Sequence, residues 1–264
     1  MDFFIVTPSF NQKKFLEQTI KSVIGQQTKG EVNYWVFDGG STDGSKELLK
    51  KYDKQLNWQS KKDKGQTDAI NKGVKELKNW LKKTGKDSKQ VAFAYLNSDD
   101  YYLPNTFSLV EKLLARTNAQ WLVGDCVIVD ERNQKIHQLV RFYKQWWRFW
   151  LSKSLLGVLN PIPQPGVFIR ASEILKIGSF DERLHYTMDY DYWFKLFAKS
   201  GMPLRVSTAL AAFRIHGLSK GGKEFMPQFK EQYQVAQRYI KNRAILGLQR
   251  LHTTITIIFY RLIK

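Results

Sequence analysis

The sequence predicts an α/β fold in which a mostly parallel central sheet is flanked by helices and followed by a helical C-terminal extension. Two observations support this fold class. Short apolar runs alternate with longer runs of helical periodicity over most of the chain. Acidic residues also follow several of the apolar runs directly, at the points where parallel strands would bring their carboxyl ends to one edge of the sheet.

The N-terminal half shows the clearest alternation of strands and helices. The expected strands are residues 3–7, 33–37, 57–60 and 90–96. The expected helices are residues 14–26, 41–51 and 67–83. Ser41 and Thr42 have the side chains that commonly cap a helix, so the second helix is expected to begin there. The third helix carries Ile70, Val74 and Leu77 at helical spacing.

The C-terminal half alternates less regularly. The expected helices are residues 106–116 and 190–200, with a further helical segment from residue 229 onward. The expected strands are residues 121–129, 134–140, 167–170, 204–206 and 209–215, with 134–140 paired to 121–129. Residues 160–166 contain three prolines and cannot form regular structure. Residues 214–222 are expected to form a flexible polar loop rich in glycine.

The single cysteine and the N-terminus limit the class of protein. Cys126 stands alone, which excludes an internal disulfide and favours a reducing compartment. Its expected role is that of a small buried apolar side chain. The first residues lack the basic start of a secretory signal, and no stretch reaches the roughly 20 apolar residues of a membrane-spanning helix.

The charge is strongly basic, with 42 Lys and Arg against 24 Asp and Glu and a net charge of +18. Such a field favours polyanions: nucleic acid, anionic lipid or anionic sugar donors. Residues 138–155 interleave basic and aromatic residues without an acid, a composition typical of the lipid headgroup region. Burial of these rings against the domain is an equal alternative. Binding of nucleic acid is not expected, because no recognised nucleic-acid module is present.

Acidic clusters mark the candidate site. They are Asp38, Asp68, Asp99 with Asp100, and Asp189 with Asp191. Paired carboxylates after a strand suit Mg²⁺ or Mn²⁺, although adjacent aspartates also cap helices. Carboxylates two residues apart on a helix point in different directions, so one can face a cleft while the other caps the helix. Three separate carboxylates that orient a base, hold a metal on a diphosphate and take a proton are what sugar transfer from a nucleotide requires.

Two further segments could hold an anion. Residues 64–68 open a helix, where free N–H groups and the helix dipole favour anionic partners. His216 follows Arg214 in the Gly-rich loop, and this pair could close on a diphosphate. A solvated loop histidine is the alternative.

Seven motifs, in order along the chain, resemble the family-2 glycosyltransferases of the GT-A fold, which has a Rossmann-like central sheet. The motifs are Thr7-Pro-Ser-Phe-Asn11, Phe37-Asp-Gly-Gly-Ser-Thr-Asp-Gly44, Asp63-Lys-Gly-Gln-Thr-Asp-Ala-Ile-Asn-Lys-Gly73, Leu96-Asn-Ser-Asp-Asp100, Gln164-Pro-Gly-Val-Phe168, Gly178-Ser-Phe-Asp-Glu182 and Asp189-Tyr-Asp-Tyr-Trp-Phe-Lys195. The resemblance runs from about residue 3 to about residue 219 and is to the bacterial inverting type (WcaA/WcaE-like).

The resemblance implies a site for a nucleotide-sugar donor, of UDP type, and a divalent metal. The donor-binding residues would be Thr7, Pro8, Ser9, Asn11, Asp38, Gly65, Gln66, Asp68, Asn97, Ser98, Arg214 and His216. Asp38 would accept from the base edge, with Asp68 near the base and ribose. Asp99, with His216, would hold Mn²⁺ or Mg²⁺ on the donor diphosphate. Asn97 replaces the first acid of the family's Asp-x-Asp, which lowers the negative charge around the metal.

The resemblance also implies the catalytic residues and the partners. Asp189 matches the family's general base, with Asp191 just behind it, and the acceptor side would be formed by Gln164, Pro165, Gly166 and Trp193. Residues 1–222 would be the catalytic domain, with a nucleotide-binding half (1–100) and an acceptor-binding half (101–222). The expected activity is inverting transfer to a glycan or lipid-linked acceptor in cell-surface polysaccharide synthesis, in the cytoplasm or at the inner membrane face. A non-catalytic binding module on the same fold is the alternative.

The extension over residues 223–264 is expected to be helical. Its apolar stripe recurs at steps of three and four residues: Leu248, Leu251, Ile255, Ile258 and Leu262. Residues 228–264 hold seven basic residues against one acid, Glu231. A helix of this kind can lie in an anionic membrane surface. Packing on the catalytic domain, or on a second subunit of a homodimer, is an equal alternative.

Overall fold

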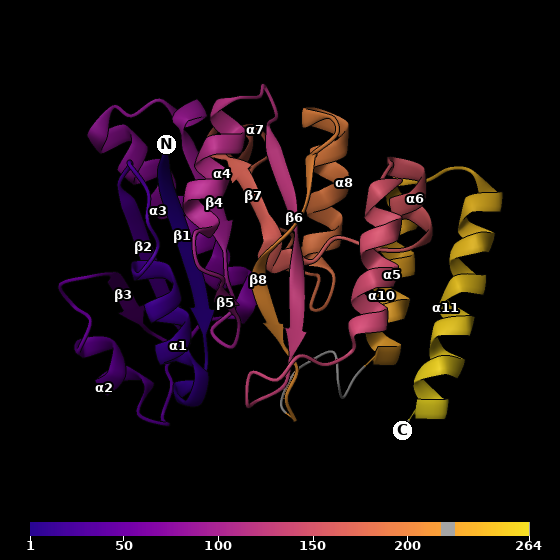
Figure 1. The fold of residues 1–264 in the computed structure, drawn as a ribbon, viewed down its shortest axis with the longest axis horizontal. Coiled ribbons are helices and arrows are strands. Elements are labelled where there is room, and N and C mark those ends of the chain that lie inside the picture. Colours follow the sequence, from indigo (N-terminus) through magenta and orange to yellow (C-terminus); the bar gives the residue numbers. More distant parts are fainter. Residues whose placement is uncertain (218–224, 264) are drawn as a thin grey trace.

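The computed structural model of the chain describes residues 1–217 and 225–263. Within them, eight strands form one sheet in the order β3-β2-β1-β4-β7-β6-β8-β5, covered by helices (Figure 1). The strands are β1 (Asp2–Ser9), β2 (Val32–Asp38), β3 (Asn57–Ser60), β4 (Val91–Tyr95), β5 (Tyr101–Tyr102), β6 (Trp121–Val129), β7 (Val167–Arg170) and β8 (Leu204–Arg214). The predicted α/β class is therefore confirmed.

The strand directions place a ligand site between β1 and β4. Strands β1 to β4 are mutually parallel, β6 and β8 are parallel to each other, and β7 runs antiparallel between β4 and β6. The chain moves outward from β1 to β3 and then returns to the other side of β1 with β4. In open α/β sheets, ligands bind at such a reversal of strand order, outside the carboxyl ends of the strands.

The helices form two layers because alternate strand residues point to opposite faces. The helices are α1 (Lys13–Ile24), α2 (Ser45–Lys50), α3 (Gln66–Thr84), α4 (Thr106–Ala115), α5 (Gln138–Phe149), α6 (Lys153–Val158), α7 (Ala171–Ile177), α8 (Met188–Ser200), α10 (Phe225–Tyr239) and α11 (Arg243–Ile263). Phe4 and Val6 lie in a core with α3, α7 and α8. Phe3 and Ile5 lie in the opposite core with α1, α2 and α4.

The C-terminal helices are tied to the domain to different degrees. Helix α10 places Val235, Ala236 and Ile240 in the same core as α8, and its Tyr239 ring stacks on Phe194 at 4.8 Å between centroids. Helix α11 packs along α6 and α10 and lies at the outer edge of the molecule (Figure 1). No helix of the described residues is both long and apolar enough to cross a membrane.

Several predicted elements are confirmed with their bounds. Residues 57–60, 121–129 and 167–170 are β3, β6 and β7. The expected strands 204–206 and 209–215 are one strand, β8, with an irregular register opposite β6. Among the described residues, five short elements were not predicted: β5, α6, α7 and the 3₁₀ helices Ser88–Gln90 and Gln164–Gly166, the second of which lies in the segment expected to lack regular structure. The loop expected over 214–222 lies partly outside the described residues, since 218–224 are not described.

Two local predictions are wrong. Helix α2 begins at Ser45 after Gly44, and the Ser41 Oγ accepts the Asn11 amide at 2.8 Å and donates to the Asp38 carboxylate instead of capping a helix. Residues 134–140 do not form a strand: only Lys135 bridges to Val129, and α5 begins at Gln138. The apolar residues that follow recur at helical spacing, and this periodicity decides the local structure.

Candidate functional site

The loops that follow β1 and β2 are fastened to each other beside the strand reversal. The buried Asp38 carboxylate accepts hydrogen bonds from the Gly40 and Ser41 amides (3.1 and 2.9 Å) and from the Ser41 and Ser60 hydroxyls. Asn11, at a positive φ of 51°, receives the Thr42 amide on its side-chain oxygen at 3.0 Å. Asp38 therefore shapes the loop in which a nucleotide base is expected to lie.

The first residues expected to bind the sugar donor, at the end of β1, are buried. Thr7 is fully buried, and its hydroxyl is 3.0 Å from the Tyr34 hydroxyl. Pro8 is also buried within β1. Ser9 is buried at the end of β1, and its hydroxyl has no partner among the described residues. Of these three residues, Ser9 is the one whose side-chain oxygen has no partner among the described residues and could bond to a ligand.

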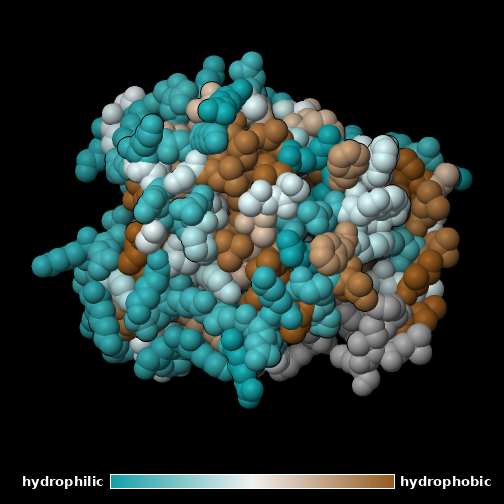
Figure 2. Space-filling view, in the orientation of Figure 1, coloured by the Kyte–Doolittle hydropathy of each residue, from teal (hydrophilic) through white to brown (hydrophobic). Residues whose placement is uncertain are grey.

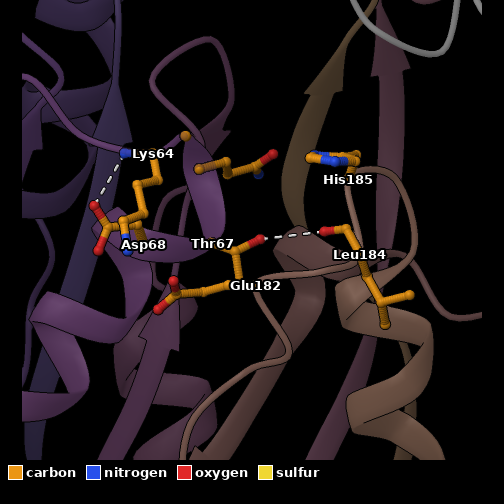
Figure 3. Close-up of a pocket in the computed structure, with 8 residues that line it drawn as sticks. Lys64, Thr67, Asp68, Glu182, Leu184 and His185 are labelled. Atoms are coloured by element: carbon orange, nitrogen blue, oxygen red, sulfur yellow. Dashed lines mark hydrogen bonds between the residues drawn. The ribbon is translucent and has the colours of Figure 1, made fainter.

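The start of α3 forms one wall of a small pocket (Figure 3). Gly65 precedes the helix at φ 114°, a conformation that side chains rarely adopt. Asp68 accepts the Lys64 amide at 3.1 Å and pairs with Lys72 at 3.0 Å. The opposite wall is the segment 182–185, which Thr67 contacts through its hydroxyl and the Leu184 carbonyl at 3.5 Å. The pocket thus joins α3 to the segment that leads into α8.

The segment after β4 holds the residues expected to bind a metal. Asp99 Oδ2 lies 3.0 Å from His216 Nε2, so β4 and β8 bring together an oxygen and a nitrogen ligand separated by more than a hundred residues. Gln66 donates to Asn97 Oδ1 at 2.7 Å, which links this segment to α3. The described residues contain no group of three or more His, Cys, Asp or Glu side chains that could hold a metal. Asp99 and His216 could together supply two ligands to a divalent cation, and any others would have to come from a bound molecule or water.

Arg214 differs from its expected place in a mobile loop. It ends β8, is buried, and donates from Nε to the Asp99 carbonyl at 2.7 Å and from Nη2 to Gln18 Oε1 at 2.7 Å. Its guanidinium also lies over the Phe15 ring, 4.6 Å from the centroid. Arg214 therefore holds the backbone of Asp99 in place through its guanidinium group. Ser98 is likewise buried.

Asp189, the expected general base, has a raised pKa. It lies in the first turn of α8, and its Oδ1 accepts the Tyr190 amide at 2.7 Å. Burial raises the pKa of Asp189 to about 6, with Lys144 opposing the shift and Glu231 adding to it. Burial and then the charges of Asp189 and Asp100 raise the pKa of Tyr95 well above its ordinary value. The charges of Asp189 and of Asp100, in the segment after β4, therefore both act on Tyr95, the last residue of β4.

Asp191 and Trp193 point away from this site. Asp191 is buried and faces α10, where it accepts from the Tyr239 hydroxyl at 2.8 Å and lies 3.5 Å from Arg238. Lys195 pairs with its other oxygen at 2.7 Å. Trp193, expected on the acceptor side, is fully buried and stacks on Trp121 in the core. The expectation for Trp193 is therefore corrected, because a side chain on that face of α8 enters the core.

The remaining acceptor residues do lie beside the end of β4. Gln164 donates to the Tyr95 carbonyl at 2.7 Å, while its Oε1 is buried without a partner among the described residues. Pro165 is buried, and Gly166 passes so close to β6 that an added Cβ would lie 2.9 Å from the Gly124 carbonyl oxygen. Gln164 thus offers an unpaired amide oxygen close to the site.

Two features of the site were not predicted from the sequence. Asp125 of β6 is buried and pairs with Arg141 at 2.7 Å and with Arg148, which fastens α5 beside the acceptor side. Glu231 of α10 accepts the amides of His185, Tyr186 and Thr187 at 3.0, 2.8 and 2.8 Å, and the Thr187 hydroxyl at 2.8 Å. Glu231 is the last acidic residue of the sequence and stands alone in a basic extension. That isolated acid was the feature of the sequence that could have pointed to a specific role for Glu231.

Open α/β sheets bind their ligands, nucleotides among them, at such a strand reversal. The chain belongs to glycosyl transferase family 2, whose profile matches residues 4–169. The matched range includes the sites around Asp38, Asp68 and Asp99, and it ends before Asp189 and His216.

Relatives of this chain are glycosyltransferases without an assigned reaction. An uncharacterized glycosyltransferase of Rickettsia prowazekii is 27% identical over 201 residues, which is 75% of this chain and 59% of the relative. An uncharacterized glycosyltransferase of Mycobacterium tuberculosis is 38% identical over 71 residues, which is 26% of this chain and 27% of the relative. The chain thus spans about three fifths of the length of the Rickettsia prowazekii relative.

Solved structures confirm the GT-A-like fold. TarS residues 1–349 of S. aureus, in complex with UDP-GlcNAc, matches with a TM-score of 0.68 and 15% identity over 96% of this chain and 72% of that chain. The mannosyltransferase PcManGT of Pyrobaculum calidifontis, in complex with GDP-Man and Mn²⁺, matches with a TM-score of 0.66 and 12% identity over 95% and 69%. At these identities the likeness establishes the fold.

Proposed function

We propose that this chain is an inverting, metal-dependent glycosyltransferase that moves a sugar from a nucleoside-diphosphate donor, of UDP type, to a hydroxyl of a glycan or lipid-linked acceptor. The observation that carries the proposal is that Asp99, paired with His216 at 3.0 Å, follows β4, whose last residue, Tyr95, also lies within electrostatic reach of Asp189. The pair is a candidate metal site, and Asp189, with its raised pKa, is a candidate base. The structural neighbours that hold UDP-GlcNAc, or GDP-Man with Mn²⁺, support a nucleotide-sugar donor.

The donor half of the site supports binding of a nucleoside diphosphate. The base and ribose would lie along the loop that Asp38 shapes and against the α3 start at Gly65 and Asp68. Asn97 and Gln66, already bonded to each other, would face the ribose or sugar. A divalent cation held by Asp99 and His216 would neutralise charge on the leaving diphosphate.

The acceptor half supports a single displacement. Asp189 would accept the proton of the acceptor hydroxyl as that oxygen attacks the anomeric carbon from the face opposite the diphosphate. One such displacement inverts the anomeric centre and needs no second nucleophilic carboxylate. Gln164, with its unpaired oxygen, would orient the acceptor. We assign proton removal to Asp189 alone, because Asp191 is occupied by α10.

The biological setting proposed is synthesis of a cell-surface polysaccharide or glycolipid precursor at the cytoplasmic side of the membrane. A non-catalytic nucleotide-sugar module is the second candidate, and Asn97 in place of an acid favours it, because fewer charges surround the metal. Measured transfer or hydrolysis of a nucleotide sugar would identify an enzyme, and binding without either reaction would identify the non-catalytic module.

The test is a panel of nucleotide sugars with and without Mn²⁺, applied to the unchanged chain and to Asp99→Ala. We expect binding of a nucleoside diphosphate that Mn²⁺ strengthens and EDTA reverses, and we expect Asp99→Ala to lose the Mn²⁺ effect while keeping the metal-free affinity. Calorimetry measures both. An unchanged Mn²⁺ effect in Asp99→Ala would remove Asp99 from the metal site, and donor binding without any transfer or hydrolysis across the panel would favour the non-catalytic module.

A further inference from the structure

Two helices leave large apolar side chains in solvent. On and directly after α5 these are Leu139, Phe142, Trp146, Phe149 and Trp150, and on α11 they are Leu248, Leu251, Ile255 and Ile258. Their exposed fractions run from 52% to 85%. We call these nine side chains the apolar rim. Single exposed apolar residues need no explanation, whereas a group of this size on neighbouring elements marks an interaction surface.

The two halves of the apolar rim lie on adjoining helices. Tyr143 of α5 and His252 of α11 are 2.9 Å apart through Oη and Nε2, and their rings stack at 6.3 Å between centroids. On α11, the partly buried Ile245 and Leu246 and the buried Gln249 turn toward the domain. The exposed stripe recurs at steps of three and four on the next face of the helix, beside His252. Figure 2 shows brown side chains along the edge where α11 lies in Figure 1.

The segments that carry the apolar rim contain no carboxylate side chain. No Asp or Glu occurs between Glu131 and Glu173, or after Glu231. The same two stretches of sequence contain thirteen Lys and Arg residues. Of these, Lys144 on α5 and Lys153 at the start of α6 are exposed. These two stretches therefore contribute basic but no acidic side chains to the surface around the apolar rim.

The combination of exposed apolar side chains and basic residues favours an anionic bilayer over a second copy of the chain as the partner of this surface. A second copy of the chain would bring two sets of these basic, acid-free stretches together, and like charges at an interface disfavour association. A bilayer with anionic headgroups complements the charge and accepts the apolar side chains at the level of the acyl chains. Trp residues beside basic residues suit the headgroup boundary. No described helix could cross a membrane, so the contact would be peripheral.

We propose that α5 and α11 form a docking surface for an anionic lipid bilayer, into which the apolar rim inserts. Each basic residue near an anionic surface strengthens binding by about fivefold (about 1 kcal/mol), and this contribution falls with salt. The inserted apolar residues provide a salt-resistant part of the binding. This docking does not depend on the transferase chemistry, because the apolar rim includes none of the site residues.

The experiment is sedimentation with vesicles of phosphatidylcholine alone and of phosphatidylcholine with an equal part of phosphatidylglycerol, at low and high salt. The full chain is compared with Trp146→Glu/Phe149→Glu on α5 and Leu251→Glu/Ile255→Glu on α11. The matched control is Leu175→Glu/Met202→Glu, which changes two exposed apolar residues on other elements. Thermal denaturation and binding of a nucleoside diphosphate verify that each variant is folded.

We expect the full chain and the control to sediment with the anionic vesicles, and each of the two rim variants to bind them at least about tenfold more weakly. Phosphatidylcholine vesicles should bind much less protein. Equal sedimentation of all four proteins would overturn the proposal. So would a dimer in sedimentation velocity, without lipid, that either rim variant converts to a monomer, because the occupant would then be a second copy.

Discussion

At the scale of single residues, the site depends on which of two neighbouring carboxylates is already bonded to the rest of the protein. The carboxylates of Asp189 and Asp191 are two residues apart on α8, and the sequence predicted that they would point in different directions. The structure shows Asp191 fastened to α10 by Tyr239, while Asp189 remains near Tyr95 with a pKa of about 6. A base whose pKa lies just below neutral pH is largely ionised there and still accepts a proton effectively.

The first prediction is a rate that rises with pH as Asp189 ionises. Because its pKa is about 6, turnover should fall about tenfold per unit below pH 6 and level off above pH 7. Asp189→Asn should lower turnover about 10²–10⁴-fold and remove this limb, with donor affinity kept. Initial rates from pH 5 to pH 8.5, with donor titrations at each end, measure both. If Asp191→Asn abolishes turnover and Asp189→Asn does not, the assignment is reversed.

The raised pKa of Asp189 also affects the stability of the protein, and this effect shows whether a loss of activity comes from unfolding. The folded-state pKa of Asp189 lies above its unfolded value, so the folded state binds the proton more tightly and loses stability as pH rises through about 6. Asp189→Asn avoids that loss. The variant should therefore be at least as resistant to urea as the unchanged chain at pH 7.5, although it is nearly inactive. A marked loss of stability would mean that the activity defect comes from unfolding.

At the scale of elements, α8 is held at its start by another helix. Three amides and one hydroxyl of residues 185–187 converge on Glu231 of α10, so the turn before Asp189 depends on one carboxylate from the C-terminal extension. The sequence could not show this, because nothing local to residues 185–187 indicates a partner more than forty positions away. Apolar runs did predict β6 and β7, since a buried strand needs only its own residues to be recognised.

Sequence patterns failed at the elements whose local signals compete. Residues 134–140 have a β-like start, yet helical periodicity continues into α5 and decides the structure. Ser41 has the chemistry of a helix cap, but its hydroxyl donates to the Asp38 carboxylate and its Oγ accepts the Asn11 amide at 2.8 Å, so this side chain joins two loops. At Ser41 a tertiary interaction overrides a correct local preference, whereas at residues 134–140 one local pattern overrides another.

The second prediction is that Glu231 positions Asp189. Glu231→Gln keeps the shape but weakens the hydrogen bonds to the amides and removes a charge that raises the pKa of Asp189. We expect turnover to fall about 10-fold or more, since a base displaced by a fraction of an ångström loses efficiency, and the acidic limb of the pH profile to move to lower pH. Donor affinity should be unchanged. Gln234→Ala, an exposed change on the same helix, is the matched control.

A merely structural role for Glu231 would give a different result. In that case Glu231→Gln would lower the melting temperature while leaving the position of the acidic limb where it was. Glu231→Asp, which keeps the charge on a shorter side chain, should preserve the limb and lose part of the turnover. These three readouts together separate positioning from stability.

At the scale of the whole molecule, the extension is two parts with different attachments. The sequence predicted one helical extension from residue 223 outside a domain of residues 1–222. In the structure α10 fills part of the core and holds α8, whereas α11 packs along α6 and leaves its apolar stripe exposed. Leu262 of the predicted stripe lies outside the residues whose side chains the structure describes.

The last prediction follows from this division. Truncation after residue 222 removes α10 and with it the buried Val235, Ala236 and Ile240. Losing large buried side chains costs about 2–5 kcal/mol each, against a total stability of about 5–15 kcal/mol for a domain. The shortened chain should therefore fail to fold or unfold well below the melting temperature of the full chain. Truncation after Gly247 keeps α10 and should retain a cooperative transition, nucleotide binding and turnover, while losing the α11 half of the apolar rim. Urea denaturation and limited proteolysis of the three lengths measure the difference. A cooperative transition in the chain that ends at residue 222, equal to that of the full chain, would show that α10 is dispensable for the fold.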